Sequence, residues 1–142
     1  MFEEVLLQIN GSNTLIVGAT GDIGTQIAIT LKDLGQNIHG VGRNKTKLHD
    51  LENLGIKTSA IDIGNENAII DFAKSCENFD NVILCSGVNG PRPSRMCNDA
   101  FIRGVINTNL LGIMNFTSNL IRRNKICSPG RIVFISSIAC HI

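Results

Sequence analysis

The sequence predicts an α/β fold, a doubly wound parallel sheet with helices on both faces. Three observations support this prediction: apolar segments alternate with amphipathic ones, glycines end several amphipathic segments, and a glycine-rich corner follows the first apolar segment. Strands and helices that alternate with short connections form right-handed crossovers, so the strands are parallel. We expect the strand order 3-2-1-4-5, with a ligand at the switch between strands 1 and 4.

The first unit is a strand followed by the glycine corner. The run Thr14–Val17 is apolar and rich in branched residues, as in a strand that is buried on both faces. A helix then begins at about Asp22 and ends near Leu34-Gly35, where glycine is the expected stop. Glycines let the backbone turn tightly and approach a ligand, and the N–H groups at a helix start attract phosphate. The corner therefore predicts a site for the pyrophosphate of a dinucleotide.

On spacing alone, this corner has two interpretations. Glycines often form a bend without a ligand, and G-x-x-G-x-x-G differs from the commoner dinucleotide fingerprint G-x-G-x-x-G. The strand before the corner and the helix after it favour binding. The candidate residues are those of the corner, Gly18, Ala19, Thr20, Gly21, Asp22, Ile23 and Gly24.

The rest of the chain continues the alternation. We expect strands at 37–43, 56–61, 81–85 and 131–137, and helices at 45–54, 66–76 and 99–123. Residues 1–13 predict a lead-in of one or two helical turns that ends in a turn at 10–13. The helix at 99–123 is apolar on more than one face, so its second face packs either in a crowded core or against a partner chain. A homo-oligomer through this helix is one of the two possibilities.

Composition and charge argue against several classes of protein. The formal net charge is +1 and no basic stripe is present, which argues against general binding of nucleic acid or membrane surfaces. Glu3 and Glu4 stand where a signal peptide needs positive charge, so we expect a cytoplasmic protein. The five cysteines include no C-x-x-C pair, so neither a disulfide framework nor a metal site is indicated.

An ordered set of motifs follows the predicted strands. Besides the glycine corner, it consists of Gly42–Leu48, Asp62, Ser86-Gly87, Asn109–Gly112 and Arg131–Ser137. With this set, the chain from about residue 14 resembles the N-terminal part of a classical short-chain dehydrogenase/reductase. The resemblance implies a Rossmann-like NAD(P)-binding domain at 14–142 that is incomplete after strand five. The glycine spacing also fits the extended branch of the superfamily, which includes sugar-nucleotide epimerases.

Arg43 and its neighbour Asn44 follow the second predicted strand, where a dinucleotide-binding fold places its ribose-reading residue. An acid there would accept hydrogen bonds from the ribose hydroxyls and repel a 2′-phosphate, whereas Arg offers that phosphate a charged, forked donor. The sequence therefore favours NADP(H) over NAD(H). The alternative is that Arg43 faces solvent at a strand end, as Lys45 and Lys47 would.

Further coenzyme contacts are implied by the resemblance. Asp62 matches the carboxylate that reads the adenine amino group, and Ile63 matches the residue beside the ring, although Asp62 also suits a simple turn. The fourth strand of the family commonly ends in Asn-Asn-Ala-Gly. Here Cys85, Ser86 and Gly87 end it, so only the glycine that lets the backbone pass the ribose is kept.

Two residues match catalytic positions of the family. Asn109 matches the Asn whose local helix distortion lets its backbone hold a water of the proton relay, and Ser137 matches the Ser that hydrogen-bonds the reacting carbonyl. The Tyr-x-x-x-Lys of the family follows that Ser by a little over a dozen residues, but this sequence contains no Tyr and ends at Ile142. We therefore expect the coenzyme-binding half of an oxidoreductase for a carbonyl or alcohol substrate, inactive alone. The alternative is a module that binds NADP(H) without turnover.

Overall fold

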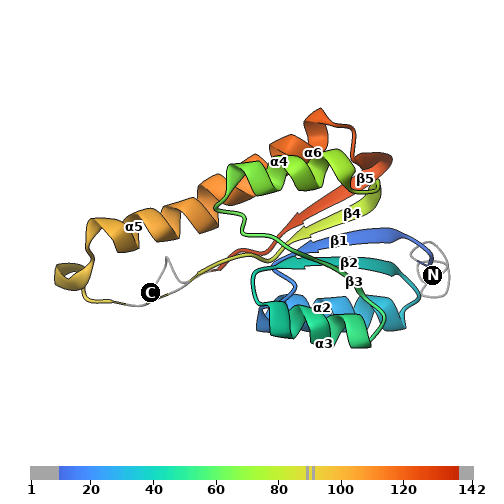
Figure 1. The fold of residues 1–142 in the computed structure, drawn as a ribbon, viewed down its shortest axis with the longest axis horizontal. Coiled ribbons are helices and arrows are strands. Elements are labelled where there is room, and N and C mark those ends of the chain that lie inside the picture. Colours follow the sequence, from blue (N-terminus) through green and yellow to red (C-terminus); the bar gives the residue numbers. More distant parts are fainter. Residues whose placement is uncertain (1–9, 89, 91, 138–142) are drawn as a thin grey trace.

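The computed structural model describes residues 10–88, 90 and 92–137, and its centre is a parallel sheet (Figure 1). Every strand pairing in this sheet is parallel. The strand order β3-β2-β1-β4-β5 confirms the predicted fold class and order. The five strands are β1 (Asn13–Val17), β2 (Asn37–Gly42), β3 (Lys57–Ala60), β4 (Phe79–Leu84) and β5 (Ile126–Phe134).

Helices cover both faces of the sheet. Figure 1 shows α2 (Asp22–Asp33) and α3 (Lys45–Asn53) on one face, and α4 (Glu66–Ser75) with α6 (Ile113–Arg122) on the other. In the figure α6 is the end of one long helix, which starts with α5 (Asp99–Ile106) and passes through the π-helical segment η2 (Asn107–Gly112). A short 3-10 turn, η1 (Ser94–Met96), precedes this helix. None of the described helices is long and apolar enough to cross a membrane.

The first strand is buried on both faces, as its apolar run predicted. Leu15, Ile16 and Val17 are completely buried. Because side chains alternate along a strand, Leu15 and Val17 belong to the apolar cluster that includes Phe116 of α6, while Ile16 belongs to the cluster that includes Leu51 of α3. This strand therefore joins the two cores and fixes the place where the glycine corner emerges.

The structure corrects the start and the end of the last strand. We expected residues 131–137 after a turn at Pro129-Gly130, but β5 begins at Ile126 and ends at Phe134. Phe79 of β4 already pairs with Ile126, and Asn81 pairs with Arg131, so the Pro-Gly pair forms an irregularity inside the strand. A bulge accommodates the extra residues without breaking the ladder. Ser137 consequently lies beyond the strand.

Smaller differences concern the ends of other elements. The strand predicted at 81–85 begins two residues earlier, at Phe79, and β1 begins at Asn13 rather than Thr14. The apolar side chain of Ile23 is 59% exposed, because the first turn of α2 lies at the carboxyl edge of the sheet. The helical lead-in predicted for 1–13 falls mainly on residues 1–9, outside the described part of the chain.

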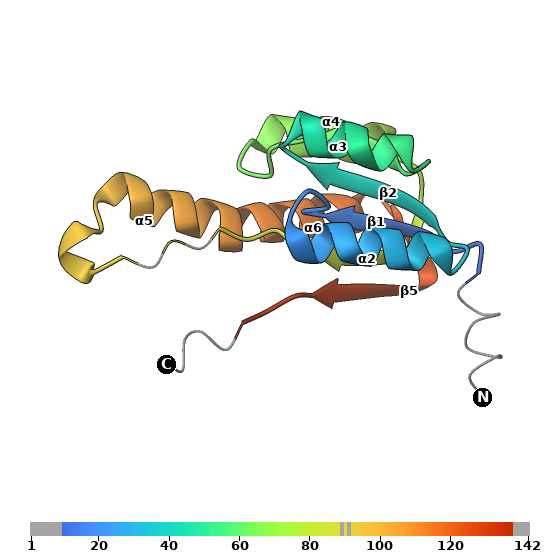
Figure 2. The same ribbon diagram turned by 90° about the horizontal axis from the view of Figure 1, so that it is seen from below.

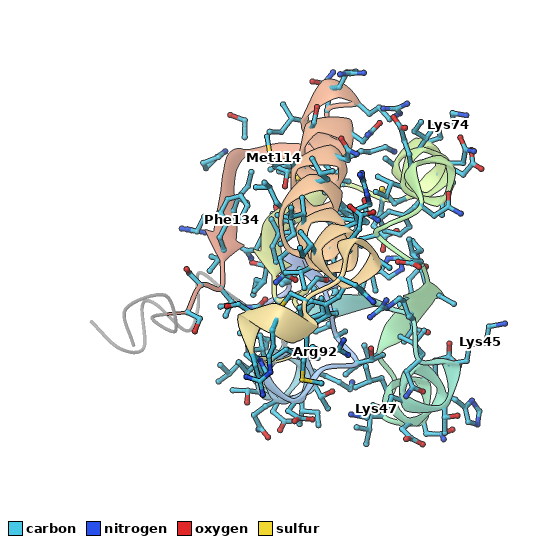
Figure 3. The ribbon with its side chains drawn as sticks, turned by 90° about the vertical axis from the view of Figure 1, so that its left-hand side faces the viewer. Lys45, Lys47, Lys74, Arg92, Met114 and Phe134 are labelled. Atoms are coloured by element: carbon cyan, nitrogen blue, oxygen red, sulfur yellow. The ribbon has the colours of Figure 1, made fainter. Side chains whose placement is uncertain are left out.

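One flank of the molecule exposes apolar residues. β5 is an edge strand, and Figure 2 shows it on the outside of the sheet, away from β2. The long helix packs its Phe116 and Leu120 into the core, but Met114 and Ile121 are more than half exposed. Met114 and Phe134 line an apolar groove between α6 and β5 (Figure 3). Within the described residues, no element covers the second face of this helix.

Candidate functional site

A cleft of about 230 Å³ opens at the carboxyl edge of the sheet. Its walls come from the corner after β1, from the end of β2, and from the chain that follows β2, β3 and β4, with one residue from η2. The lining residues are Gly18, Thr20, Gly21, Val41, Gly42, Arg43, Ile61, Ile63, Cys85, Ser86, Gly87 and Thr108. The cleft thus lies at the switch between β1 and β4, the place that the predicted topology assigns to a ligand.

Gly18 makes the close approach between the corner and β4 possible. Its φ of +94° lies in the left-handed region, and a Cβ here would lie 2.7 Å from the backbone nitrogen of Ser86. The N–H groups of Gly18 and Ala19 donate to the carbonyl of Val41, at 2.8 and 2.9 Å. A Cβ at Gly24 would overlap the carbonyl oxygen of Gly18. Glycine at these two positions therefore permits the tight turn.

The start of α2 lacks a side-chain cap. Its N-cap is Gly21, whereas α3, α4 and α5 begin with Asn side chains that accept a backbone N–H. Among the described residues, no protein acceptor meets the N–H groups at the corner and in the first turn, those of Thr20, Asp22, Ile23 and Gly24. Unpaired amides with the positive end of the helix dipole favour an anion. This turn is thus open to a phosphate, and its binding of a pyrophosphate stays a prediction.

Arg43 stands where β2 leaves the sheet. It lines the cleft and is exposed, and it makes no ion pair within the described part of the chain. Gly42 brings this strand end close to the corner, since a Cβ there would lie 2.6 Å from the side chain of Thr20. The side chain of Asn44 caps α3 by accepting the N–H of Lys47 at 3.1 Å. Arg43 is therefore free to meet a ligand, while Asn44 has a structural role.

The segment after β3 contributes an apolar wall. Ile61 and Ile63 are 7% and 6% exposed, and both line the cleft. Asp62, between them, is exposed and accepts the N–H of Gly64 at 2.9 Å, which is the turn-forming role considered for it. Asp62 is not among the lining residues. Its contact with adenine stays a prediction, whereas Ile63 lies where a ring could pack.

Cys85, Ser86 and Gly87 all line the cleft, as expected from their place after β4. The N–H of Cys85 donates to the carbonyl of Val17 at 2.8 Å, which continues the pairing of the two strands to the floor of the cleft. Burial raises the pKa of the Cys85 thiol. The thiol is therefore protonated at neutral pH and is a poor nucleophile.

Asn109 joins the long helix to the loop after β4. Its Oδ1 accepts the N–H of Val88 at 2.8 Å, and its Nδ2 donates to the carbonyl of Val88 at 2.9 Å. The residue lies inside η2, and π-helical turns are frequent at functional sites. A local distortion of the helix is therefore present at the position where the resemblance implied one. Its role in holding a water stays a prediction.

Ser137 lies three residues beyond β5 and is exposed. The chain still follows the sheet at Ile135, whose N–H donates to the carbonyl of Leu84 at 3.0 Å. Because β4 and β5 are parallel, Ser137 leaves the sheet at the same edge as the cleft. It is not among the residues that line the cleft.

Four residues of the cleft were not among the candidates from the sequence, Val41, Gly42, Ile61 and Thr108, and of these Gly42 was named only as the start of a motif. Val41 and Ile61 read as ordinary apolar residues of strand ends. Thr108 had no motif of its own, although it directly precedes Asn109 and is the one lining residue from η2. Among the described residues, no group of three His, Cys, Asp or Glu side chains could hold a metal ion.

A family model for the short chain dehydrogenase matches residues 12–142. The chain belongs to the short chain dehydrogenase family. Its relatives include 3-oxoacyl-[acyl-carrier-protein] reductase FabG of Rickettsia felis, 27% identical over 136 residues, and that of Rickettsia bellii, 29% identical over 139 residues. In both cases the match covers 94% of this chain and 56% of the relative. The chain thus spans about half the length of these relatives.

Solved structures with the same fold include the following two. A short-chain type dehydrogenase/reductase from Mycobacterium ulcerans superposes with a TM-score of 0.78 at 26% identity, covering 92% of this chain and 52% of that one. BdcA, solved in complex with NADPH, superposes with a TM-score of 0.82 at 21% identity, covering 91% and 53%.

The cleft fits the nicotinamide coenzymes that this family binds. The tight corner at Gly18, where a Cβ would clash with Ser86, leads into amides that meet no acceptor in the described part of the chain, which suits a pyrophosphate. The apolar side chain of Ile63 and the cation of Arg43 lie on the same cleft, so both a ring and a further anion can be accommodated.

Proposed function

We propose that this chain is the coenzyme-binding part of an NADP(H)-dependent oxidoreductase that interconverts a carbonyl and an alcohol by hydride transfer. The observation that carries the proposal is the uncapped start of α2, which opens into a cleft with Arg43 on its wall. The FabG relatives are named as reductases, and one structural neighbour was solved with NADPH, which supports the choice of coenzyme.

Each part of the cleft has a proposed contact. The N–H groups of the first turn of α2 hold the pyrophosphate, Ile63 packs beside the adenine, and Arg43 donates to the 2′-phosphate. Gly87 lets the backbone pass close to a ribose. The bound coenzyme supplies the nicotinamide that gives or takes a hydride.

Two residues have proposed roles toward the substrate. The Ser137 hydroxyl donates a hydrogen bond to the reacting carbonyl oxygen, and the backbone at Asn109 holds a water of the proton relay. The sequence contains no Tyr, so the residue that exchanges the hydroxyl proton in the resembled mechanism is not part of this chain. We expect the chain alone to bind coenzyme without turnover, and the longer protein to be active.

The second candidate is a module that binds NADP(H) without catalysis. It would use the same cleft and the same contacts to the coenzyme, but without transfer of hydride to a substrate. Turnover of carbonyl substrates by the longest natural form of the protein decides between the two candidates. An active enzyme supports the oxidoreductase, and an inactive protein that still binds NADPH supports the module. An extended-type epimerase is less favoured, because the relatives reported above are reductases and dehydrogenases.

Coenzyme choice is tested by titrating the purified protein with NADPH and NADH. Arg43→Ala is expected to weaken NADPH about 10-fold or more, because a charged hydrogen bond to the 2′-phosphate is lost, and to leave NADH within about 2-fold. Lys45→Ala is the matched control. It removes a positive charge two residues after Arg43, and the Lys45 side chain points outward in Figure 3. If the unaltered protein bound NADPH and NADH with equal affinity, the proposal that Arg43 binds the 2′-phosphate would be wrong.

A further inference from the structure

A second cation, four residues after Arg43 in the sequence, is held by a carboxylate. Lys47 is in the first turn of α3, and its Nζ lies 3.6 Å from Oδ1 of Asp22 in the first turn of α2. The ion pair therefore links the starts of two helices on one face of the sheet. Figure 3 shows Lys47 between these helices, whereas Lys45 points away.

Asp22 has two opposite effects at this place. Its carboxylate is favourable at the start of α2, where it meets the positive end of the helix dipole. It also stands between Gly21 and Ile23, beside amides that meet no acceptor within residues 10–88, 90 and 92–137 and are open to an anion, and its side chain is fully exposed. A negative charge at this position repels a phosphate that approaches these amides, and its pairing with Lys47 keeps that cation from a phosphate beside Arg43.

Two cations that follow β2, Arg43 and Lys47, differ in whether a carboxylate pairs with them. Arg43 lines the cleft without an ion pair among the described residues, while Lys47, four residues later, is paired. Lys47 is about half exposed and its side chain is long, so it could turn toward a phosphate beside Arg43 if Asp22 did not hold it.

We propose that Asp22 is a specificity-determining residue, which keeps Lys47 away from the 2′-phosphate and thereby limits the preference for NADP(H) that Arg43 creates. This inference rests on the proposed function, because it concerns the same coenzyme site. Exposed ion pairs change an equilibrium by no more than about 5-fold, so the effect of Asp22 is a moderate one.

The test is a double-mutant cycle on the purified protein, with dissociation constants for NADPH and NADH. Asp22→Asn is expected to tighten NADH about 2-fold, because a negative charge beside the pyrophosphate is lost, and NADPH about 5-fold, because Lys47 is also released toward the 2′-phosphate. Lys47→Met alone is expected to change NADPH by less than about 2-fold. In the Asp22→Asn background, Lys47→Met is expected to remove most of the gain in NADPH affinity. The effects of the two substitutions on NADPH binding are therefore not additive.

Two further variants separate this effect from general changes. Asp71→Asn removes the carboxylate of a similar exposed pair, Lys74–Asp71 at 3.3 Å on α4, and should leave both coenzymes unchanged. Asp22→Ser, which keeps a polar residue at the helix start, should give the same gain as Asp22→Asn. Thermal unfolding of each variant shows whether it is folded.

The proposal is overturned if neither change of Asp22 tightens NADPH, if the changes tighten NADPH and NADH equally, or if Lys47→Met weakens NADPH equally in both backgrounds. A protein that binds neither coenzyme before any substitution contradicts the proposed function instead, so the two failures can be told apart.

Discussion

The two ends of the sheet differ in how their polar groups are paired. At the carboxyl end, amides in the first turn of α2 meet no acceptor among the described residues. Near the amino end, the buried His39 is hydrogen-bonded at both ring nitrogens. Its Nδ1 lies 3.0 Å from Oε1 of Glu77, and its Nε2 lies 2.8 Å from Oγ of Ser59. Lys57 Nζ donates to the other carboxylate oxygen of Glu77 at 2.8 Å. The difference indicates that one end is built to bind and the other to stabilise.

The network at the amino end has a defined protonation. Glu77 accepts from Nδ1–H of His39, so Nε2 accepts the hydroxyl of Ser59. Burial lowers the pKa of His39, and Glu77 offsets this only in part. Burial also opposes ionisation of Glu77, but hydrogen bonds from Lys57, its own backbone and His39 together lower its pKa to about 2. At pH 7 the network therefore contains a neutral imidazole and an ionised carboxylate.

The largest effect is expected for a substitution in the glycine corner, at the carboxyl end of the sheet. Gly18→Ala places a Cβ at positive φ within 2.7 Å of Ser86 N, so we expect a loss of about 3 kcal/mol in the free energy of unfolding and no measurable NADPH binding. Gly11→Ala is the matched control: its φ is +77°, but no atom lies within 4 Å of the new Cβ. It should lose only about 1 kcal/mol and keep NADPH binding.

Urea unfolding and NADPH titration measure both variants. If Gly18→Ala were as stable as Gly11→Ala and bound NADPH normally, the close approach of the corner to β4 would not matter for either property. The contrast between the two ends of the sheet would then lose its physical basis.

At the amino end of the sheet, we expect a smaller effect, a pH dependence of the free energy of unfolding. The folded-state pKa of His39 lies below the ordinary 6.5, so its contribution is present above about pH 6.5 and is lost as the pH falls below that value. The contribution of Glu77 is present above the ordinary 4.5 and is lost as the pH falls toward its folded pKa of about 2. The free energy of unfolding should therefore decrease in two steps as the pH is lowered.

Glu77→Gln should remove the lower step and cost about 1 kcal/mol at pH 7, a modest value because the Glu77 side chain is 37% exposed. NADPH binding should not change. Glu66→Gln, an exposed carboxylate outside the network, is the control and should keep both steps. Urea unfolding between pH 3 and pH 8 measures the curves, and a curve of Glu77→Gln that matches the unaltered protein would contradict the proposed pairing.

The sequence predicted what depends on local patterns. The buried strand at Leu15–Val17 and the glycine corner were recognisable because apolar periodicity and glycine spacing are local, and alternation then implied the strand order. The bulge inside β5 was missed because Pro129-Gly130 is typical of a turn, and pairing with Phe79 decided otherwise. Local sequence cannot reveal such a tertiary contact.

The same reason explains what was missing from the candidate site. Asn109 could be placed in a helix, but its contact with Val88, 21 residues earlier, depends on how the long helix packs. His39 looked like an isolated histidine, since Ser59 and Glu77 are 20 and 38 residues away in the sequence. Thr108 was likewise unrecognisable, because only the π-helical turn and the fold bring it to the cleft.

The most direct test of the account is to follow backbone amide resonances by NMR while NADPH is added. We predict large shifts for Thr20, Asp22, Ile23 and Gly24, whose N–H groups lack protein acceptors among the described residues, and little change for His39. NADPH binding that leaves the four corner amides unchanged would contradict the account, because the coenzyme phosphates would then lie elsewhere.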